Sequence, residues 1–461
     1  MDANQVARDN RRLYSSFNIL LTRRFLWQCS DKYLIGVEKY FPLRNCFAKV
    51  TIHCVCVKLT HMKILLEDTI PFGCEYLAPL GEVTTYAWQT LSKDAIKQAD
   101  IMAIRSTTQI NQQSIAPCPQ LNFVTTATAG TNHMDTDWLD SQGITWGSAG
   151  GCNAVAVAEY VVSTVLQAHK ANIVNIEQCT VGIVGAGHVG TALSKLLDAL
   201  NIHYKLCDPP LEAQGDSREF YKLQDILTCD VISLHVPFVK SGPFATGHLI
   251  DAAALAQMSS SQLFINACRG EVVDEAALIA RLSQENPPTV ALDVFANEPN
   301  INRELLALCW QVTPHIAGHS VEGKVRGTQI IYEQICAIAG KPVQKKLNDV
   351  LEVLAPTRVA LTNKDADSLT TEDLTALFLS VYDVKIDDAT MRDALSPLST
   401  LSNDTRGATD DPAPALASQF STLRKQYRVR RECSAYTLIL PEGTSNGIKQ
   451  QLMALGFAIH Q

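Results

Sequence analysis

Three residues with complementary chemistry follow one another in the second half of the chain: Arg269, Glu298 and His315. A guanidinium can hold a carboxylate through two parallel charge-assisted hydrogen bonds, so Arg269 could orient a small organic acid. An imidazole can accept a hydroxyl proton, and a neighbouring carboxylate can fix its tautomer and stabilise the imidazolium. These residue types in this order indicate oxidation of a 2-hydroxy acid, with His315 as the general base and Glu298 as its partner.

Each of these residues also has an ordinary structural explanation when it is taken singly. Arg269 could be a surface cation at a strand end, Glu298 an acid at a helix start before Pro299, and His315 a half-buried histidine with one backbone hydrogen bond. The catalytic interpretation depends on their shared placement, because all three follow consecutive predicted strands. Ligands of open α/β sheets bind at the carboxyl ends of the strands.

A glycine turn upstream predicts the redox partner. An apolar strand at 180–184 leads into Gly185-Ala186-Gly187-His188-Val189-Gly190 and then a helix with apolar periodicity. The glycines permit a tight turn, close approach of a pyrophosphate and close helix packing, and the helix N-terminus favours phosphate. Asp208 ends the next predicted strand, 23 residues after Gly185, where a carboxylate binds ribose hydroxyls and repels a 2′-phosphate. A purely structural glycine turn is the alternative interpretation. Because the strand, the helix and the acidic residue all accompany the turn, we predict an NAD site.

The elements that must position these residues alternate as strands and helices. Six predicted strands form a doubly wound Rossmann domain: 180–184, 204–208, 230–235, 263–266, 289–294 and 311–313. Five earlier strands predict a flavodoxin-like first domain: 64–66, 83–85, 101–104, 123–125 and 144–146. The expected fold class is therefore α/β, with two doubly wound parallel-sheet domains and a small C-terminal α/β domain.

Domain boundaries follow from shifts in composition. Residues 1–61 carry a net charge of +6, whereas the whole chain carries −8. We therefore interpret them as an atypical N-terminal extension before a native start at Met62. The alternative is a targeting arm or a nucleic-acid-binding arm. Residues 62–155, completed by about 317–345, are expected to bind substrate, and residues 156–316 to bind NAD. Residues 346–461 form a third region, in which 397–416 predicts a loop and 436–440 a strand.

Composition argues against other classes of protein. The net negative charge disfavours nucleic-acid binding as the main activity, and no stretch approaches the ~20 apolar residues of a membrane span. The 14 cysteines follow neither a disulfide framework nor a zinc-site spacing. We expect a reduced cytoplasmic protein without a metal.

The glycine turn and the contexts of Arg269, Glu298 and His315 resemble the D-isomer-specific 2-hydroxyacid dehydrogenases over Met62 to about residue 340. Further stretches resemble one branch of that family, which acts on a phosphorylated sugar acid: 126–133, 151–156, 206–210, 315–318, 381–384 and 430–432. The resemblance implies hydride transfer from a small phosphorylated 2-hydroxy acid to NAD+. It also implies a homodimer formed through the C-terminal domain.

By the same resemblance the catalytic residues are Arg269, Glu298 and His315. The implied cofactor-binding residues are Gly185, Gly187, His188, Val189, Gly190, Asp208, Val236, Ala267, Cys268, Arg269, Asp293 and Gly318. The implied substrate-binding residues are Ser106, Thr128 and His319; without the resemblance, capping of strand ends would explain Ser106 and Thr128 equally well.

Two positions depart from that branch. His319 stands where it has a tyrosine, and Val236 stands where it has a hydroxyl residue. We expect His319 and Val236 to change the affinity for substrate and cofactor more than the type of reaction. The alternatives are another family member, such as phosphoglycerate dehydrogenase, or a non-catalytic NAD-sensing binding protein.

Overall fold

The computed structural model describes residues 22–29, 32–43, 46–54, 62–351, 357–360, 369–399 and 413–460. The chain divides into two compact units, residues 1–62 and 63–461. The described part of the first unit is a three-stranded antiparallel sheet of β1 (Thr22–Cys29), β2 (Lys32–Leu43) and β3 (Cys46–Cys54). Whether residues 1–61 are a non-native extension stays a prediction.

The first sheet of the α/β part has five strands in the order β5-β4-β6-β7-β8. Its strands are β4 (Met62–Glu67), β5 (Gly81–Tyr86), β6 (Ile101–Ile104), β7 (Phe123–Thr126) and β8 (Thr145–Ser148), with helices α2 (Gly73–Leu77), α3 (Lys93–Gln98), α4 (Gln112–Ile115) and α5 (Thr136–Ser141). The pairs β4–β6, β6–β7 and β7–β8 are parallel. This flavodoxin-like order brings the carboxyl end of β6, which leads to Ser106, beside that of β7, which leads to Thr128.

The second sheet has six strands in the order β10-β9-β11-β12-β13-β14, and every neighbouring pair is parallel. The strands are β9 (Thr180–Val184), β10 (His203–Cys207), β11 (Val231–Leu234), β12 (Leu263–Asn266), β13 (Thr289–Leu292) and β14 (Gln311–Val312). All six predicted strands are confirmed, although β10 ends one residue before Asp208. After β9 the chain adds β10 on one side and then β11 on the other, so the carboxyl ends of β9 and β11 flank the switch point where ligands bind in such sheets.

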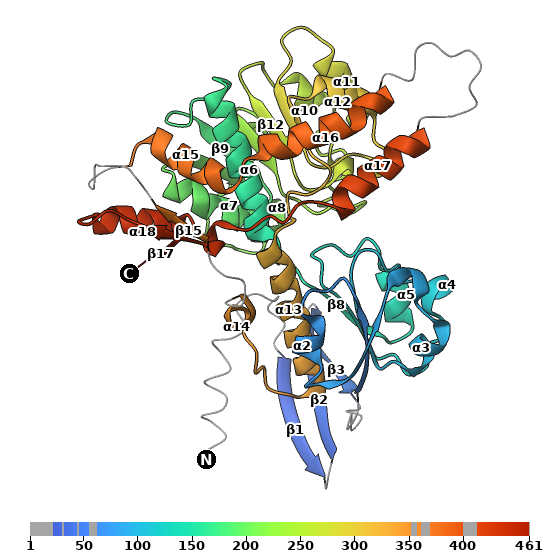
Figure 1. Ribbon diagram of the computed structural model, residues 1–461. Coiled ribbons are helices and arrows are strands. Elements are labelled where there is room, and N and C mark those ends of the chain that lie inside the picture. Colours follow the sequence, from blue (N-terminus) through green and yellow to red (C-terminus); the bar gives the residue numbers. More distant parts are fainter. Residues whose placement is uncertain are drawn as a thin grey trace. The chain divides into compact units, whose positions relative to one another are not determined.

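The helices that accompany this sheet are short except for the first two (Figure 1). They are α6 (Ala154–Lys170), α7 (His188–Ala199), α8 (Pro209–Ala213), α9 (Leu223–Ile226), α10 (Ala252–Ala256), α11 (Glu275–Leu282) and α12 (Arg303–Leu308). Apolar and small residues lie all round α6, and nearly all of its residues are buried. None of the helices in the described part of the chain is long and apolar enough to span a bilayer.

Helix α13 (Val321–Ala339) follows the second sheet and returns to the first. Ser320 caps its N-terminus by accepting the Gly323 N–H, and Gly340, at φ 64°, ends it in the left-handed conformation. Gln334 accepts a hydrogen bond from Thr125 Oγ1 at 2.6 Å and donates one to the Ser148 carbonyl at 2.8 Å. These two bonds hold α13 to β7 and β8.

The C-terminal region contains a third parallel sheet in the order β15-β16-β17. Its elements are α14 (Leu347–Leu351), β15 (Thr357–Ala360), α15 (Thr371–Val381), α16 (Val384–Ser399), α17 (Ala413–Lys425), β16 (Tyr436–Ile439), α18 (Asn446–Ala454) and β17 (Ala458–Ile459). The predicted strand at 436–440 is confirmed as β16. Phe378 and Leu438 belong to the same buried cluster as Val161 of α6 and Val181 of β9, so this region shares its core with the second sheet.

The predicted loop at 397–416 is wrong at both ends. Helix α16 extends to Ser399 and α17 begins at Ala413, while residues 400–412 lie outside the described residues. Pro414 falls in the first turn of α17, where a missing N–H breaks no helical hydrogen bond. Leu416 and Phe420 are spaced one turn apart and are buried. Composition rich in small and polar residues concealed this short amphipathic helix, and α17 packs against α16 (Figure 1).

Candidate active site

His315 and Glu298 form a hydrogen-bonded pair on the loops that follow β14 and β13. His315 Nδ1 lies 2.7 Å from Glu298 Oε2, and the Phe295 N–H donates to Glu298 Oε1 at 3.0 Å. The pair uses Nδ1 of the imidazole and leaves Nε2 for a reactant. Burial alone would raise the pKa of Glu298, but hydrogen bonds and charge from His315, together with the Phe295 N–H and Arg424, hold that pKa below its ordinary value. Glu298 is therefore an ionised partner for the imidazole.

A buried aspartate holds the turn that presents His315. Asp293 Oδ1 accepts hydrogen bonds from Thr313 Oγ1 at 2.6 Å and from the Ile316 N–H at 2.8 Å, and Oδ2 accepts from the Ala317 N–H at 2.9 Å. Burial raises the pKa of Asp293 to about 6 despite nearby His315 and these donors. His315 itself has φ 56°, a strained conformation for a residue other than glycine. Asp293, expected to contact NAD, thus also has a positioning role that sequence reasoning missed.

Arg269 lies at the end of β12 in a turn fixed by a buried amide. Asn266 Nδ2 donates to the Arg269 carbonyl at 2.9 Å, and Asn266 Oδ1 accepts from the Cys268 N–H at 3.1 Å. The guanidinium donates to the Cys268 carbonyl at 2.7 Å and to Asn132 Oδ1 at 3.4 Å. A Cβ at Gly270 would lie 2.0 Å from the carbonyl carbon of Phe295, so the loop of Arg269 is pressed against the loop that leads to Glu298. The remaining guanidinium N–H groups can bind a carboxylate.

The glycine turn has the shape that a pyrophosphate requires. Gly185 has φ 95°, and a Cβ there would lie 2.6 Å from the His235 carbonyl oxygen. A Cβ at Gly190 would lie 2.1 Å from the Gly185 oxygen, whereas a Cβ at Gly187 would meet no atom within 4 Å. Two glycines therefore allow close packing, and exposed Gly187 leaves the start of α7 open to an anion.

Asp208 stands at the carboxyl end of β10, as the ribose contact requires, and also holds the glycine turn. Its Oδ2 accepts from the Ala186 N–H at 2.8 Å, and its Oδ1 accepts from the Leu211 N–H at 3.0 Å, which caps α8. Sequence reasoning missed Arg218, which donates to the Ala186 carbonyl at 2.9 Å. Asp216 binds that guanidinium through both carboxylate oxygens, each at 2.9 Å.

The other predicted cofactor positions lie around the same edge of the sheet. Val189 is in the first turn of α7, beside His188, and a Cβ on Gly151 would lie 2.7 Å from the His188 ring. Val236 follows β11 and abuts Gly185, and Ala267 and Cys268 follow β12. Burial raises the pKa of the Cys268 thiol to about 11, as for a packing residue. Gly318 lies against Asn153, where a Cβ would come within 2.2 Å of the amide nitrogen.

Ser106 and Thr128 occupy neighbouring loops after β6 and β7. Ser106 is exposed in a loop held by Glu67, which accepts the Arg105 N–H at 2.8 Å and the Thr108 hydroxyl at 2.6 Å. The Thr128 hydroxyl lies 2.7 Å from the Thr126 hydroxyl and donates to the Gly130 carbonyl at 3.1 Å. The geometry places both residues at the expected sheet edge, and their substrate contacts remain a prediction.

His319 follows His315 in the chain and packs against the C-terminal region. Its ring centroid lies 5.9 Å from that of Tyr427, and its buried Nδ1 has no hydrogen-bond partner in the structure. Burial, followed by the charges of Lys324, Arg424, His315 and Arg105, lowers its pKa well below the ordinary value. A neutral His319 can donate one hydrogen bond to a ligand.

Arg424 is a site residue that sequence reasoning missed. Its Nη1 lies 3.9 Å from Glu298 Oε2, although the two residues are far apart in the chain. No local pattern distinguishes an arginine near the end of an ordinary helix, so only the fold reveals this approach. The C-terminal region, interpreted as a dimerisation domain, thus also reaches the site.

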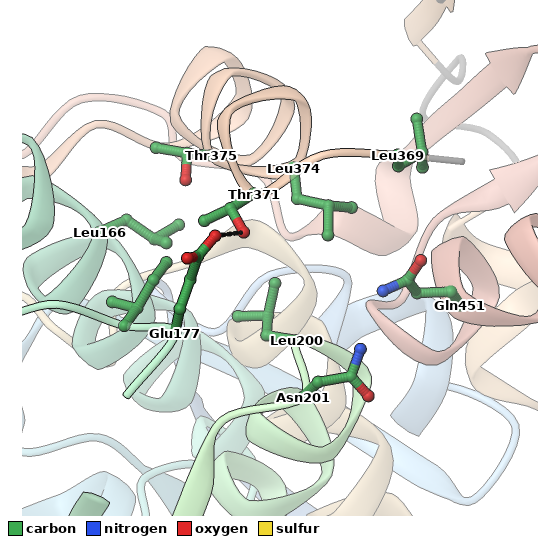
Figure 2. A pocket seen from close by; sticks show the side chains of 10 residues that line it. Leu166, Glu177, Leu200, Asn201, Leu369, Thr371, Leu374, Thr375 and Gln451 are labelled. Carbon is green, nitrogen blue, oxygen red and sulfur yellow. Dashed lines mark hydrogen bonds between the residues drawn. The ribbon is translucent and has the colours of Figure 1, made fainter. Parts of the chain in front are cut away.

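A separate cavity of about 220 Å³ lies between the ends of α6 and α7 and the C-terminal region (Figure 2). Its lining includes Leu166, Leu200 and Leu374, and across it Thr371 donates to Glu177 at 2.8 Å. None of its lining residues belongs to the predicted site. We therefore treat it as distinct from the proposed catalytic centre.

The sequence matches known proteins over most of its length. Residues 154–317 match the model of the D-isomer specific 2-hydroxyacid dehydrogenase NAD binding domain, and residues 354–456 match a domain of unknown function. Erythronate-4-phosphate dehydrogenase of Pseudoalteromonas atlantica is 41% identical over 396 residues, covering 86% of this chain and 99% of that protein. The enzyme of the same name from Marinobacter nauticus is 41% identical over 401 residues, covering 86% and 100%.

The chain belongs to the erythronate-4-phosphate dehydrogenase family. Within this family of NAD-dependent dehydrogenases, the matched NAD-binding domain contains the glycine turn, Arg269, Glu298 and His315. A solved D-lactate dehydrogenase from Aquifex aeolicus, complexed with NAD and lactic acid, superposes with a TM-score of 0.50 at 20% identity, covering 61% of this chain and all of that one. That likeness confirms the α/β fold class.

Proposed function

We propose that this chain oxidises 4-phospho-D-erythronate to 2-oxo-3-hydroxy-4-phosphobutanoate with NAD+, a step that the resemblance assigns to pyridoxal 5′-phosphate biosynthesis. The observation that supports it best is the 2.7 Å bond between His315 and Glu298, on loops beside that of Arg269. The high identity to named erythronate-4-phosphate dehydrogenases supports the choice of substrate.

The protein groups divide the chemistry among them. Arg269 binds the substrate carboxylate and thereby orients C2 and its hydroxyl. His315 Nε2 accepts the hydroxyl proton, the C2–H electron pair leaves as hydride, and the C2–O bond becomes a carbonyl. Bound NAD+ supplies the hydride acceptor. Glu298 stabilises the imidazolium that forms, because its carboxylate stays ionised beside the ring.

The remaining assignments accompany this reaction. Ser106, Thr128 and His319 contact the substrate. Residues 62–155 together with about 317–345 form the substrate-binding domain, 156–316 the NAD-binding domain, and 346–461 the domain through which a homodimer forms. We also place the protein in the cytoplasm; the free state of the cysteines in the described residues supports a reducing compartment.

The experiment is to mix the purified chain with NAD+ and separate 2-hydroxy acids and to follow NADH absorbance. We expect turnover with 4-phosphoerythronate and much weaker turnover with 3-phosphoglycerate or D-lactate. Reduction with 3-phosphoglycerate alone would favour phosphoglycerate dehydrogenase. NAD binding without any turnover would favour an NAD-sensing binding protein. Light scattering should give a molar mass twice that of one chain. A molar mass equal to that of one chain would contradict the proposed homodimer.

A further inference from the structure

The chain passes between the first and second sheets through two connections that lie side by side. Residues 149–153 lead from β8 to α6, and residues 313–320 lead from β14 to α13, whose far end is bonded to the first sheet. A Cβ at Gly318 of the second connection would lie 2.2 Å from the amide nitrogen of Asn153 in the first. Any rotation of the substrate-binding domain relative to the NAD-binding domain must therefore bend these two connections.

Residues 430–433 of the C-terminal region bind to both of these domains, and we call them the junction segment. On the side of the NAD-binding domain, the Cys433 N–H donates to Glu159 Oε1 at 2.8 Å. On the side of the substrate-binding domain, the Glu432 N–H donates to Glu322 Oε2 at 2.9 Å. Both acceptor carboxyl groups belong to buried residues. The backbone of the junction segment thus joins the two domains.

The side chain of Glu432 links the junction segment to both connections. Its fully buried carboxylate accepts the Ser320 hydroxyl at 2.7 Å through Oε1 and Arg326 Nη2 at 2.8 Å through Oε2. Arg326 Nη1 donates in turn to the Cys152 carbonyl. Glu432 therefore bonds directly to the second connection at Ser320 and reaches the first connection through Arg326.

These bonds do more than a surface ion pair could, because they span two domains. A buried ion pair is weak evidence for stability, since the loss of hydration offsets the attraction between the charges. The hydrogen bonds are directional, however, so the group favours one arrangement of the two connections. That arrangement sets where Thr128 in one domain lies relative to His315 in the other.

We propose that Glu432 and Arg326 are positioning residues that hold the substrate-binding and NAD-binding domains in the orientation that hydride transfer requires. The proposal rests on the proposed function. The bonds of the Glu432 carboxylate are to Ser320 and Arg326, neither of which is a predicted site residue. Glu432 lies within residues 354–456, which match a domain of unknown function, so that domain acts on the active site of its own chain.

Kinetics of two variants provide the first test. Glu432→Gln keeps the shape of the side chain but removes its charge, and kcat/KM for 4-phosphoerythronate should fall roughly 10- to 100-fold, because a small misplacement of reacting groups is enough. The dissociation constant of NAD+ should stay within about twofold, because the glycine turn and Asp208 lie inside one domain and share no partner with Glu432. A fluorescence titration measures it.

The second variant, Arg326→Lys, is milder and applies even where Glu432→Gln does not fold. It keeps the positive charge, but the single ammonium group of lysine cannot reproduce the fork that binds Glu432 and the Cys152 carbonyl together. We expect a smaller loss of kcat/KM in the same direction, again with unchanged NAD+ affinity.

The matched control is Asp383→Ala. Asp383 Oδ1 accepts Gln167 Nε2 of α6 at 2.7 Å, so it joins the C-terminal region to the NAD-binding domain without contacting either connection. This variant should unfold at a lower urea concentration than the wild type. Its kcat/KM should stay within about twofold of the wild-type value.

Hydrogen exchange provides a readout that does not require turnover. The complex with NADH and 4-phosphoerythronate cannot react, because NADH has no capacity to accept a hydride. In Glu432→Gln, peptides that cover residues 149–153 and 313–320 should exchange at least about tenfold faster than in the wild type, because their local opening costs less free energy. Peptides from β9 and β10 should be unchanged.

Unchanged kcat/KM in both variants, or unchanged exchange in the two connections, would overturn the proposal. So would a loss of kcat/KM in Asp383→Ala as large as that in Glu432→Gln, which would indicate a general effect on stability. Failure of the wild-type chain to oxidise 4-phosphoerythronate would instead overturn the proposed function. Exchange measured with NAD+ alone would then still decide whether Glu432 holds the connections, so the two failures are distinguishable.

Discussion

The glycine-turn region and the C-terminal region differ in how their functional residues are arranged along the chain. From β9 to Asp208 the cofactor elements are contiguous, and the turn, helix and second strand have nearly the predicted bounds. In the C-terminal region the important contacts are long-range: Arg430 donates to the Ala317 carbonyl, 113 residues away, at 2.9 Å. The comparison shows that a site built from adjacent residues is visible as a motif, whereas a site completed by distant segments is visible only after folding.

The largest expected effect tests whether the hydrogen-bonded pair of His315 and Glu298 is the catalytic centre. In His315→Asn, kcat should fall about 100- to 10,000-fold, because the general base is lost, while NAD affinity stays near wild type. Asparagine suits the left-handed backbone at this position better than alanine does. Stopped-flow measurement of NADH formation and a fluorescence titration of NAD provide the two readouts. The matched control is His248→Asn, since His248 has φ 50° and an exposed side chain; an unchanged rate in His315→Asn would refute the base assignment.

The second prediction tests whether the C-terminal region supports the turn that carries His315. Arg430 is buried and also donates to the Ala156 carbonyl at 2.7 Å, while its Nη2 lies 3.4 Å from Glu159 Oε2. Arg430→Met leaves the Ala156 and Ala317 carbonyls without their charged donor, so the free energy of unfolding should fall by about 2–4 kcal/mol. Urea denaturation measures the change.

Its control is Lys385→Met on the exposed face of α16, which also replaces a cation by an apolar side chain. That variant should unfold within about 0.5 kcal/mol of the wild type. Equal stability of Arg430→Met and Lys385→Met would show that the C-terminal region is not coupled to the His315 turn.

The third prediction concerns the glycine-turn region. In Asp208→Asn, the preference for NAD+ over NADP+ should fall roughly tenfold, because the repulsive charge is lost and Arg218 lies nearby. The ratio of kcat/KM with the two cofactors measures it. Asp230→Asn is the control, because Asp230 accepts the Thr180 N–H at the opposite end of β9. A cofactor preference that stays at the wild-type value in Asp208→Asn would remove the ribose assignment.

The smallest expected effect concerns the pH dependence of stability. The pKa of Glu298 is lowered in the fold from its ordinary value of 4.5, so its contribution to stability is present above pH 4.5 and lost as pH falls through the lowered pKa. The difference in unfolding free energy between the wild type and Glu298→Gln should therefore narrow below pH 4.5. The same series with Glu304→Gln, at an exposed position of α12, provides the baseline. A difference that stays constant across acid pH would mean that Glu298 is not stabilised as a carboxylate.

Much of the fold and the centre of the site could be predicted from local patterns. Short apolar segments separated by helical ones predicted both parallel sheets, because residue periodicity reflects which faces become buried. Arg269, Glu298 and His315 could be grouped because parallel strands deliver their following residues to one edge. Asp293 was expected as a cofactor contact, and its bonds to the His315 turn could not be foreseen from position alone. Helices α16 and α17 extend into the segment predicted as a loop. Composition does not reveal which other element a short amphipathic helix will pack against.

By itself, the sequence determined the order of strands and helices, the glycine turn, the acid after β10 and the three residue types needed for hydride transfer. These are properties of neighbouring residues, and they follow from backbone sterics and side-chain periodicity. The tertiary structure alone decided that Arg424 approaches Glu298 and that Arg430 supports the turn that carries His315. The physical reason is that electrostatic and hydrogen-bonding partners depend on distance in space, and packing of the buried core sets those distances.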